Sequence, residues 1–93
     1  MKYFDWSEEK NLKLQAVRGI SFEEIVLAIT QGGVLDDIAH PDQKKYPNQK
    51  ILVVEYDGYA YLVPYIEEKE RYFLKTIYPS RKASRKYLEN IEE

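Results

Sequence analysis

Residues 50–66 read KILVVEYDGYAYLVPYI and decide the fold. Two runs of β-branched and aromatic residues, 50–56 and 59–66, flank the pair Asp57-Gly58, which strongly favours a two-residue hairpin turn. Proline has no N–H to donate to the hydrogen-bond ladder of a strand. We therefore expect the second strand to lie at an edge, or to be bulged or shortened, at Pro64. The stretch predicts an antiparallel β-hairpin.

Shorter strands are predicted on both sides of this hairpin. VLDDIA at 34–39 precedes it, and a polar loop from His40 to Gln49 separates the two. RYFLKTI at 71–77 follows it as a further strand. Lys2 to Phe4 can form a short first strand.

A first helix is predicted directly after that strand. Asp5 and Glu8 have the spacing of a capping box, in which each side chain accepts a hydrogen bond from the backbone N–H of the other residue. A helix is therefore expected from about Trp6 to Arg18. Gly19 is suited to end it, because glycine readily adopts the left-handed conformation after the last turn.

A second helix is predicted almost at once. Ser21 and Glu24 form another capping box. Four apolar residues then follow with the spacing of one helical stripe, before Gly32-Gly33 ends the helix: Phe22, Ile25, Val26 and Ile29. Because only two residues separate the helices, we expect a helical hairpin.

The last predicted element is a helix over residues 81–93, RKASRKYLENIEE, with Ser80 as its N-cap. The order is then one strand, two helices, four strands and one helix. Helices and strands that do not alternate indicate an α+β fold with an antiparallel sheet. We expect one domain over residues 1–93, since a chain this short has room for a single core.

Composition excludes several classes of protein. The chain has no cysteine and one histidine, which argues against a disulfide framework, a thiolate metal site and a multi-histidine zinc site. Its longest apolar runs are far shorter than the roughly 20 residues of a membrane span. The first ten residues lack the apolar stretch of a signal peptide, so we expect a cytoplasmic protein. No motif asks for a cofactor, and Asp36-Asp37 is a weak metal site because adjacent strand residues point to opposite faces.

Charge is distributed unevenly along the chain. The net charge is −2, yet residues 71–88, RYFLKTIYPSRKASRKYL, contain six cations and no acid. This segment indicates a local positive field suited to a polyanion such as RNA. The alternative is a solvated helix face neutralised by nearby glutamates: Glu67, Glu68, Glu70, Glu89 and Glu92.

The segment YPSRKASRKY at 78–87 indicates function most strongly. Arg81 and Arg85 are four residues apart, as are Lys82 and Lys86, so each pair shares a helix face where like charges repel. Cations in a first turn also oppose the helix dipole. A polyanion outside the fold explains such a pattern, and Arg81 can bind a phosphate through two parallel hydrogen bonds. The candidate RNA-binding residues are Lys75, Tyr78, Lys82, Arg85 and Lys86.

Two further residues are candidates for catalysis. His40 is the one side chain whose unperturbed pKa lies near neutrality, which suits proton transfer, although a lone loop histidine is more often an ordinary surface residue. Lys50 begins a strand and could face either a site or solvent. The strand tyrosines form either a platform for stacking bases or an amphipathic cover for a small sheet: Tyr56, Tyr59, Tyr61, Tyr65 and Tyr72.

Both ends of the chain resemble one known family. F-D-W-S-E-E-K-N at 4–11 and R-G-I-S-F-E-E-I at 18–25 are similar to the opening of BrnT-type toxins. K-T-I-Y-P-S-R-K-A-S-R-K-Y at 75–87 resembles the closing strand of that family and the start of its last helix. Here the acid precedes the tryptophan instead of following it, and Arg18 stands where the family usually has histidine.

The resemblance implies a RelE-like fold, with two N-terminal helices, an antiparallel sheet and a C-terminal helix. It also implies a ribonuclease toxin that blocks translation and is neutralised by a ribbon-helix-helix antitoxin. By position, Arg81 and Lys82 match the Arg-Lys pair of the family, Lys50 matches its basic residue at the start of a strand, and His40 lies in a loop that often holds a histidine.

The leading hypothesis is therefore a metal-independent endoribonuclease. The ribose 2′-hydroxyl attacks the adjacent phosphate, Arg81 stabilises the charge that develops there, and His40 assists proton transfer. The first alternative is a non-catalytic module that binds RNA or an acidic protein tail through residues 71–88. The second is a purely structural partner in a small complex.

Overall fold

The predicted β-hairpin forms the centre of the protein in the computed structural model, which describes residues 2–89. Its strands are β3 (Gln49–Tyr56) and β4 (Tyr59–Glu67), which pair antiparallel from Tyr56 opposite Tyr59 outward. Asp57 has φ 55° and Gly58 φ 78°. Two positive φ values in a two-residue turn match the right-handed twist of the strands, so the turn prediction is confirmed.

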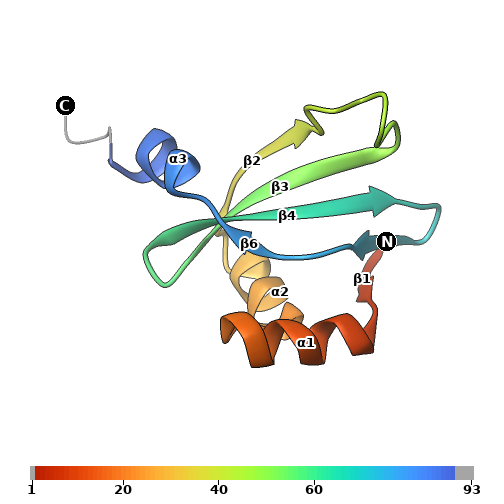
Figure 1. Cartoon of the computed structure of the whole chain (residues 1–93), viewed down its shortest axis with the longest axis horizontal. Coiled ribbons are helices and arrows are strands. Elements are labelled where there is room, and N and C mark those ends of the chain that lie inside the picture. The colour runs from red at the N-terminus through yellow and green to blue at the C-terminus, as the bar shows by residue number, and fades with distance from the viewer. Residues whose placement is uncertain (1, 90–93) are drawn as a thin grey trace.

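The hairpin lies inside a six-stranded sheet, which Figure 1 shows at the middle of the molecule. The strand order is β1-β5-β4-β3-β2, and β6 also pairs with β4. The other bounds are β1 Tyr3–Trp6, β2 Val34–Ala39, β5 Arg71–Leu74 and β6 Tyr78–Pro79. The α+β class is confirmed.

The prediction of a purely antiparallel sheet was wrong, because β1 runs parallel to β5. All other pairs are antiparallel. Parallel neighbours need a long connection between them. Here the chain supplies one, since both N-terminal helices and three strands separate β1 from β5.

Pro64 lies in β4, between β5 and β3, so of the three alternatives expected at this residue the edge position was wrong. The predicted strand 71–77 is shortened to β5, and β6 follows it at Tyr78–Pro79. These two strands pair with opposite halves of β4. Between them the chain contacts Pro64 through one bond, in which Lys75 N donates to the Pro64 carbonyl at 2.8 Å. The N–H and C=O of a strand residue point to the same side, so Pro64 lacks its N–H on the side of this gap between β5 and β6. No hydrogen bond of the ladder is lost there.

The two N-terminal helices are α1 (Glu8–Arg18) and α2 (Phe22–Thr30). The Ser21–Glu24 capping box is present, and Gly19 ends α1 with φ 68°. Asp5 is not a cap, which corrects the sequence prediction. Ser7 caps α1 instead, and its hydroxyl accepts from Lys10 N at 3.3 Å. Pairing with β5 keeps Asp5 in strand β1, so the helix starts later.

Helices lie on both faces of the sheet, as Figure 1 shows. α1 and α2 cover one face with a core that includes Phe22, Ile25 and Val54. On the other face a smaller core with Val53 and Ala60 packs against the C-terminal helix. This helix consists of α3 (Arg81–Ser84) and a π-helical turn, η1 (Arg85–Glu89). It begins where predicted, whereas positions 90–93 of the predicted helix lie outside the described residues.

Within residues 2–89, no helix is both long and apolar enough to cross a membrane.

Candidate nucleic-acid interface

The C-terminal helix is fixed to the sheet by two serine side chains. Ser80 is its N-cap, as the sequence predicts, and accepts from Ala83 N at 3.0 Å. Ser84 is buried, and its hydroxyl accepts from Ala60 N in β4 at 2.8 Å. This bond satisfies a buried backbone N–H that would otherwise lack a partner. The helix is thereby held with Ala83 and Ser84 facing β4.

The remaining positions of this helix expose cations. Arg81 and Lys82 precede the buried pair Ala83-Ser84, and Arg85 and Lys86 follow it, all four with exposed side chains. We use the name C-terminal cationic surface for these four residues together with exposed Lys75. Within residues 2–89, none of the five forms an ion pair with an acid. In the described part of the chain, ion pairs therefore do not neutralise these five charges.

Arg71, the sixth cation of the 71–88 segment, has a different environment. Its guanidinium forms ion pairs with Asp5, at 2.6 Å, and with Glu68. The hydrogen bonds that Arg71 donates to Glu68 and to Asp5, the first being the larger cause, raise the pKa of Arg71. Arg71 thus joins β5 to β1, and the surplus of positive charge along this segment is smaller than the sequence suggests.

A hollow of about 260 Å³ lies between the C-terminal helix and the sheet. Its sheet side is apolar and comes from Ile38, Val53 and Leu62, on three neighbouring strands. Its helix side carries Lys82 and Lys86, so the predicted sharing of one helix side by these two lysines is confirmed. An apolar floor with two cations beside it suits a nucleotide of a single strand, with its flat base on the floor and its phosphates against the lysines.

Tyr87 closes this hollow and links the helix to β2. Its hydroxyl donates to Asp36 Oδ2. This bond is the main cause that lowers the pKa of Asp36 and raises the pKa of Tyr87. At neutral pH Tyr87 therefore remains protonated and acts as a hydrogen-bond donor.

Asp36 and Asp37 point to opposite faces of the sheet, as predicted for adjacent strand residues. Asp36 meets Tyr87 on the face of the C-terminal helix, and Asp37 meets Tyr65 on the face of α1 and α2. Within residues 2–89, no group of three or more His, Asp and Glu side chains is placed to hold a metal ion.

Tyr78 and Lys75 lie on the same side of the sheet as this helix. Tyr78 is opposite Leu62 in the β4–β6 pair, and paired residues share a face, so Tyr78 faces the same way as the hollow. Lys75 follows β5, and its ammonium lies 5.4 Å from the centre of the Phe73 ring. The five candidate RNA-binding residues thus gather on one face: Lys75, Tyr78, Lys82, Arg85 and Lys86.

The structure does not bring His40 to Arg81. His40 begins the loop between β2 and β3, which lies at the end of the sheet away from α3 in Figure 1. Its Nδ1 accepts from Asp42 N at 3.0 Å, and its ring lies 4.5 Å from that of Tyr46. Both contacts are made within the loop and help to hold its conformation. They leave only Nε2 of the ring for another partner.

Lys50 lies on the opposite face of the sheet from the C-terminal helix. It pairs with Tyr65, a residue of the α1/α2 core, and paired residues share a face. Its ammonium is 3.5 Å from Asp37 Oδ2 on that same face. The three candidate catalytic residues therefore lie in three separate parts of the fold: Arg81, His40 and Lys50.

The strand tyrosines cover the sheet under α1 and α2. Tyr56, Tyr61, Tyr65 and Tyr72 all belong to or pack on the core of that face. Tyr56 donates to Glu24 Oε2 at 2.7 Å and Tyr65 to Asp37 Oδ1 at 2.8 Å. Burial, followed by the bond to Asp37, raises the pKa of Tyr65. The sequence left two interpretations open, a platform for stacking bases or an amphipathic cover of the sheet. The contacts of these four tyrosines are those of an amphipathic cover.

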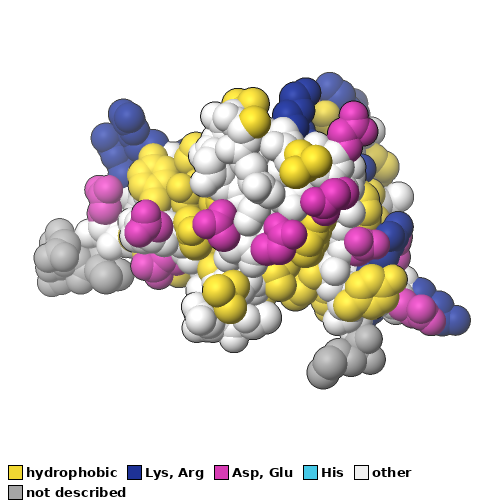
Figure 2. Space-filling view, turned by 90° about the horizontal axis from the view of Figure 1, so that it is seen from below, with side chains coloured by type: hydrophobic (Ala, Val, Ile, Leu, Met, Phe, Trp, Pro, Cys, Tyr) yellow, Lys and Arg dark blue, Asp and Glu magenta, His cyan; other side chains and the backbone are white. Residues whose placement is uncertain are grey.

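The outer face of α1 and α2 is acidic. Figure 2 looks onto this face and shows acidic side chains spread over it, with Lys and Arg toward its margins. Glu8 and Glu9 lie in the first turn of α1, and Glu23 and Glu24 in the first turn of α2. These acids lie on one face of the molecule and the C-terminal cationic surface on the other, so charge is distributed asymmetrically over the described residues.

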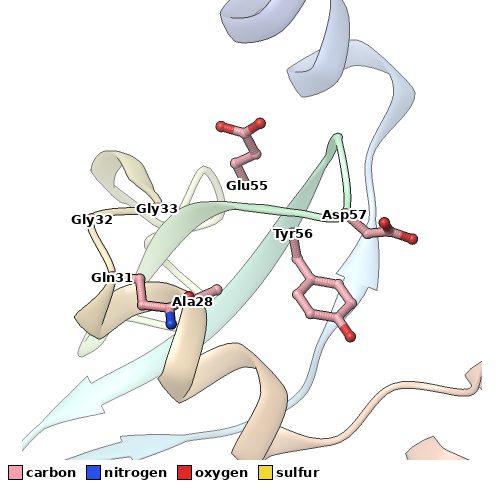
Figure 3. Close-up of a pocket in the computed structure, with 7 residues that line it drawn as sticks. All are labelled: Ala28, Gln31, Gly32, Gly33, Glu55, Tyr56 and Asp57. Atoms are coloured by element: carbon pink, nitrogen blue, oxygen red, sulfur yellow. The ribbon is translucent and has the colours of Figure 1, made fainter.

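A larger hollow of about 540 Å³ lies where α2 meets β2 and the β3–β4 turn. Figure 3 shows that Glu55 and Tyr56, which line it, point in opposite directions. The junction is tight at Gly33, where a Cβ would lie 2.8 Å from the Ala28 carbonyl oxygen. Backbone and two carboxylates, Glu55 and Asp57, dominate this hollow, so it does not suit a phosphate.

No family model, curated protein or solved structure matches this chain.

Sequence reasoning missed two residues that hold the site together. Ser84 supplies the buried bond to β4, and Asp36 holds Tyr87 over the hollow. The spacing of Ser80 and Ser84 offered a signal for the first, because a serine one turn after the cap lies on the same side of the helix. Nothing local marks the contact between Asp36 and Tyr87, which are 51 residues apart.

Proposed function

We propose that this protein is the toxin of a toxin–antitoxin pair, a metal-independent endoribonuclease that inhibits translation in the cytoplasm. The observation that carries the proposal is the C-terminal cationic surface beside an apolar hollow lined by Lys82 and Lys86. The similarity of residues 75–87 to the last strand and helix of BrnT-type toxins supports it. A RelE-like arrangement of the fold is part of the same proposal.

RNA binds with its phosphates on the cationic surface and one base over the hollow. Arg81 is exposed at the start of α3, where its guanidinium can grip the phosphate next to the bound base. The 2′-oxygen forms a bond to phosphorus as its proton passes to a solvent water molecule, and the bond to the 5′-oxygen breaks as that oxygen takes a proton from solvent. Arg81 stabilises the charge on the phosphate oxygens during this exchange. Tyr87 already donates its hydroxyl hydrogen to Asp36, and its raised pKa makes it a weak acid, so it lies beside the hollow without a role in proton transfer.

The second candidate function is a non-catalytic module that binds RNA or an acidic protein segment through the same surface. The separation of Arg81, His40 and Lys50 favours it, because no proton-accepting histidine lies beside the cations. Binding needs only the charges and the hollow. It predicts RNA retention without cleavage at any protein concentration.

Induction of the chain alone in a bacterial host tests the first candidate. We expect growth arrest with the wild type and none with Arg81→Ala at equal expression, because the variant loses the group proposed to stabilise the charge on the phosphate. Arg81 is exposed, so its removal leaves the core intact. Lys13→Ala, which removes an exposed cation from α1, is the matched control and is expected to arrest growth. If the soluble wild type is harmless, the toxin proposal fails and the binding module takes its place.

The proposed partners are RNA, on or off the ribosome, and a ribbon-helix-helix antitoxin. An antitoxin that neutralises the protein would cover the C-terminal cationic surface, so its toxin-binding segment is expected to be acidic. A short ribbon-helix-helix protein encoded by the neighbouring gene would support this part of the proposal. Its absence there would count against a toxin–antitoxin pair.

A further inference from the structure

The two outer strands of the sheet have a feature in common. Among the described strands, β1 pairs only with β5 and β2 only with β3. The free side of such a strand presents backbone N–H and C=O groups to solvent, and a second chain can pair with them. On both strands, one outward N–H is already bonded by the carboxylate of the residue before it.

On β1 the bonded N–H belongs to Trp6. Tyr3 N donates to Glu70 O, on the β5 side, and successive residues alternate in direction, so the Trp6 N–H points away from the sheet. Asp5 Oδ1 accepts from Trp6 N at 2.8 Å, and Asp5 Oδ2 accepts from Arg71 at 2.6 Å. Arg71 thus holds the carboxylate in position over the edge.

On β2 the bonded N–H belongs to Asp37. His40 N donates inward to Gln49 O, so by the same alternation the Asp37 N–H points outward. Asp36 Oδ1 accepts from it at 2.8 Å, while Asp36 Oδ2 accepts from Tyr87. A shift of register between Val34 and Asp36 further distorts this edge. Two unrelated strands therefore carry the same arrangement, each with a second donor that fixes the aspartate.

We propose that Asp5 and Asp36 are edge caps that stop the two outer strands from pairing with a second copy of this chain. In each cap the aspartate accepts a hydrogen bond from a backbone N–H that an incoming strand would need, and its carboxylate places a negative charge at the edge. Two copies that paired through β2 would also bring their aspartates together, which is unfavourable. The inference does not depend on the proposed function.

The β2 edge has the greater tendency to pair once its cap is lost. Val34 is 39% exposed and Ile38 is 38% exposed, so an added strand would cover apolar surface as well as satisfy backbone groups. β2 is also six residues long, compared with four in β1. Removal of Asp36 is therefore expected to cause stronger self-association than removal of Asp5.

Sedimentation of three variants across a range of concentrations tests the proposal. Asp36→Ala frees the Asp37 N–H and is expected to move from monomer toward dimer as concentration rises. Asp36→Asn keeps an acceptor oxygen without the charge and is expected to remain a monomer. Asp37→Ala, the matched control, removes an equal charge from the same strand but keeps the capped N–H, and is also expected to remain a monomer.

Two results would overturn the proposal: a folded Asp36→Ala that stays monomeric, or an Asp36→Asn that associates as strongly as Asp36→Ala. Hydrogen exchange of the wild type decides the matter even if Asp36→Ala does not fold. The Trp6 and Asp37 amides are expected to exchange more slowly than unbonded amides. Exchange of both at the rate of an unprotected amide would show that the caps do not form.

Discussion

The two faces of the sheet differ in how firmly their helices are attached. Within residues 2–89, nine buried residues form the core under α1 and α2, whereas three form the core under the C-terminal helix. Because burial stabilises roughly in proportion to the apolar area removed from water, the α1/α2 face supplies most of the stability. The cations lie on the weakly attached helix. Stability and the proposed binding surface are thus separated, and substitutions can address one without the other.

Phe22→Ala is expected to have the largest effect. Phe22 is completely buried and stacks on Trp6 with ring centres 5.5 Å apart. Loss of such a side chain costs about 3–5 kcal/mol of unfolding free energy. Leu62→Ala, in the partly buried floor of the hollow, is expected to cost less, because truncation at a partly exposed site leaves a smaller cavity. Urea unfolding followed by circular dichroism measures both, and equal losses would contradict the proposed difference between the faces.

Asn11→Ala is expected to break the one buried side-chain bond that joins α1 to α2. Asn11 is fully buried, its Oδ1 accepts from Phe22 N at 2.8 Å, and its Nδ2 donates to Glu23 at 2.7 Å. The Phe22 N–H then lacks a partner, at a cost of about 1–3 kcal/mol. Asn11→Asp keeps the acceptor but places a carboxylate against Glu23. Urea midpoints as high as that of the wild type would show that this link does not matter.

Ser84→Ala breaks the corresponding bond on the other face. The Ala60 N–H then loses its partner, and we expect a similar loss of about 1–3 kcal/mol. The two variants should differ in function, because only Ser84→Ala loosens the helix that carries the cations. Fluorescence titration with single-stranded RNA is expected to show weaker binding for Ser84→Ala and unchanged binding for folded Asn11→Ala. The reverse order would assign RNA to the α1/α2 face.

Acid is expected to weaken both faces through carboxylates bonded to tyrosines. Tyr56 is the main cause that lowers the pKa of Glu24 below its ordinary 4.5, and Tyr87 is the main cause that lowers the pKa of Asp36 below its ordinary 3.8. A lowered folded-state pKa stabilises the protein above the unfolded value, and this stability is lost as the pH falls through the folded value.

The matched variants Tyr56→Phe and Tyr87→Phe separate these two contributions. Each is expected to flatten the dependence of unfolding free energy on pH below neutrality, because the carboxylate loses the donor that favours its charged form. Only Tyr87→Phe is expected to alter RNA binding as well. Urea unfolding at a series of acidic pH values is the measurement, and slopes identical to the wild type would remove these bonds from the stability of the protein.

Lys82→Ala is expected to have the smallest effect on stability and a specific effect on binding. Exposed substitutions of this kind change unfolding free energy by about 0.5 kcal/mol or less. Loss of one phosphate contact to a single strand reduces the slope of log affinity against log salt by about 0.7. Lys13→Ala, on the acidic face, should leave the slope unchanged. An unchanged slope in Lys82→Ala would exclude Lys82 from phosphate binding.

Elements with local signals were predicted with good accuracy. The Asp57-Gly58 turn, the Ser21–Glu24 capping box and the Ser80 cap are all present. Each depends on residues no more than four positions apart, so the sequence window contains all the chemistry involved. The first cap failed for the opposite reason, because pairing with Arg71 and β5 holds Asp5 in a strand.

The candidate site divides in the same way. Arg81 shares a helix side with Arg85, and Lys82 shares one with Lys86, because residues four positions apart lie on the same side of a helix. The positions of His40 and Lys50 relative to Arg81 depend on strand register, in which a shift of one residue reverses the face of every side chain. The motifs at the two ends of the chain do not include β2, β3 or β4, so their similarity to a known family could not predict this register.

Helix starts, the hairpin turn and the charge surplus of residues 71–88 are written in the sequence itself, since they follow from backbone preferences and formal charge. Tertiary structure alone decides that β1 runs parallel to β5 and that Pro64 lies inside the sheet. It decides as well that, within residues 2–89, acids pair with Arg71 and not with the other cations of the 71–88 segment. It also brings Asp36 to Tyr87. These outcomes depend on partners far apart in the chain, and packing of the whole molecule selects them.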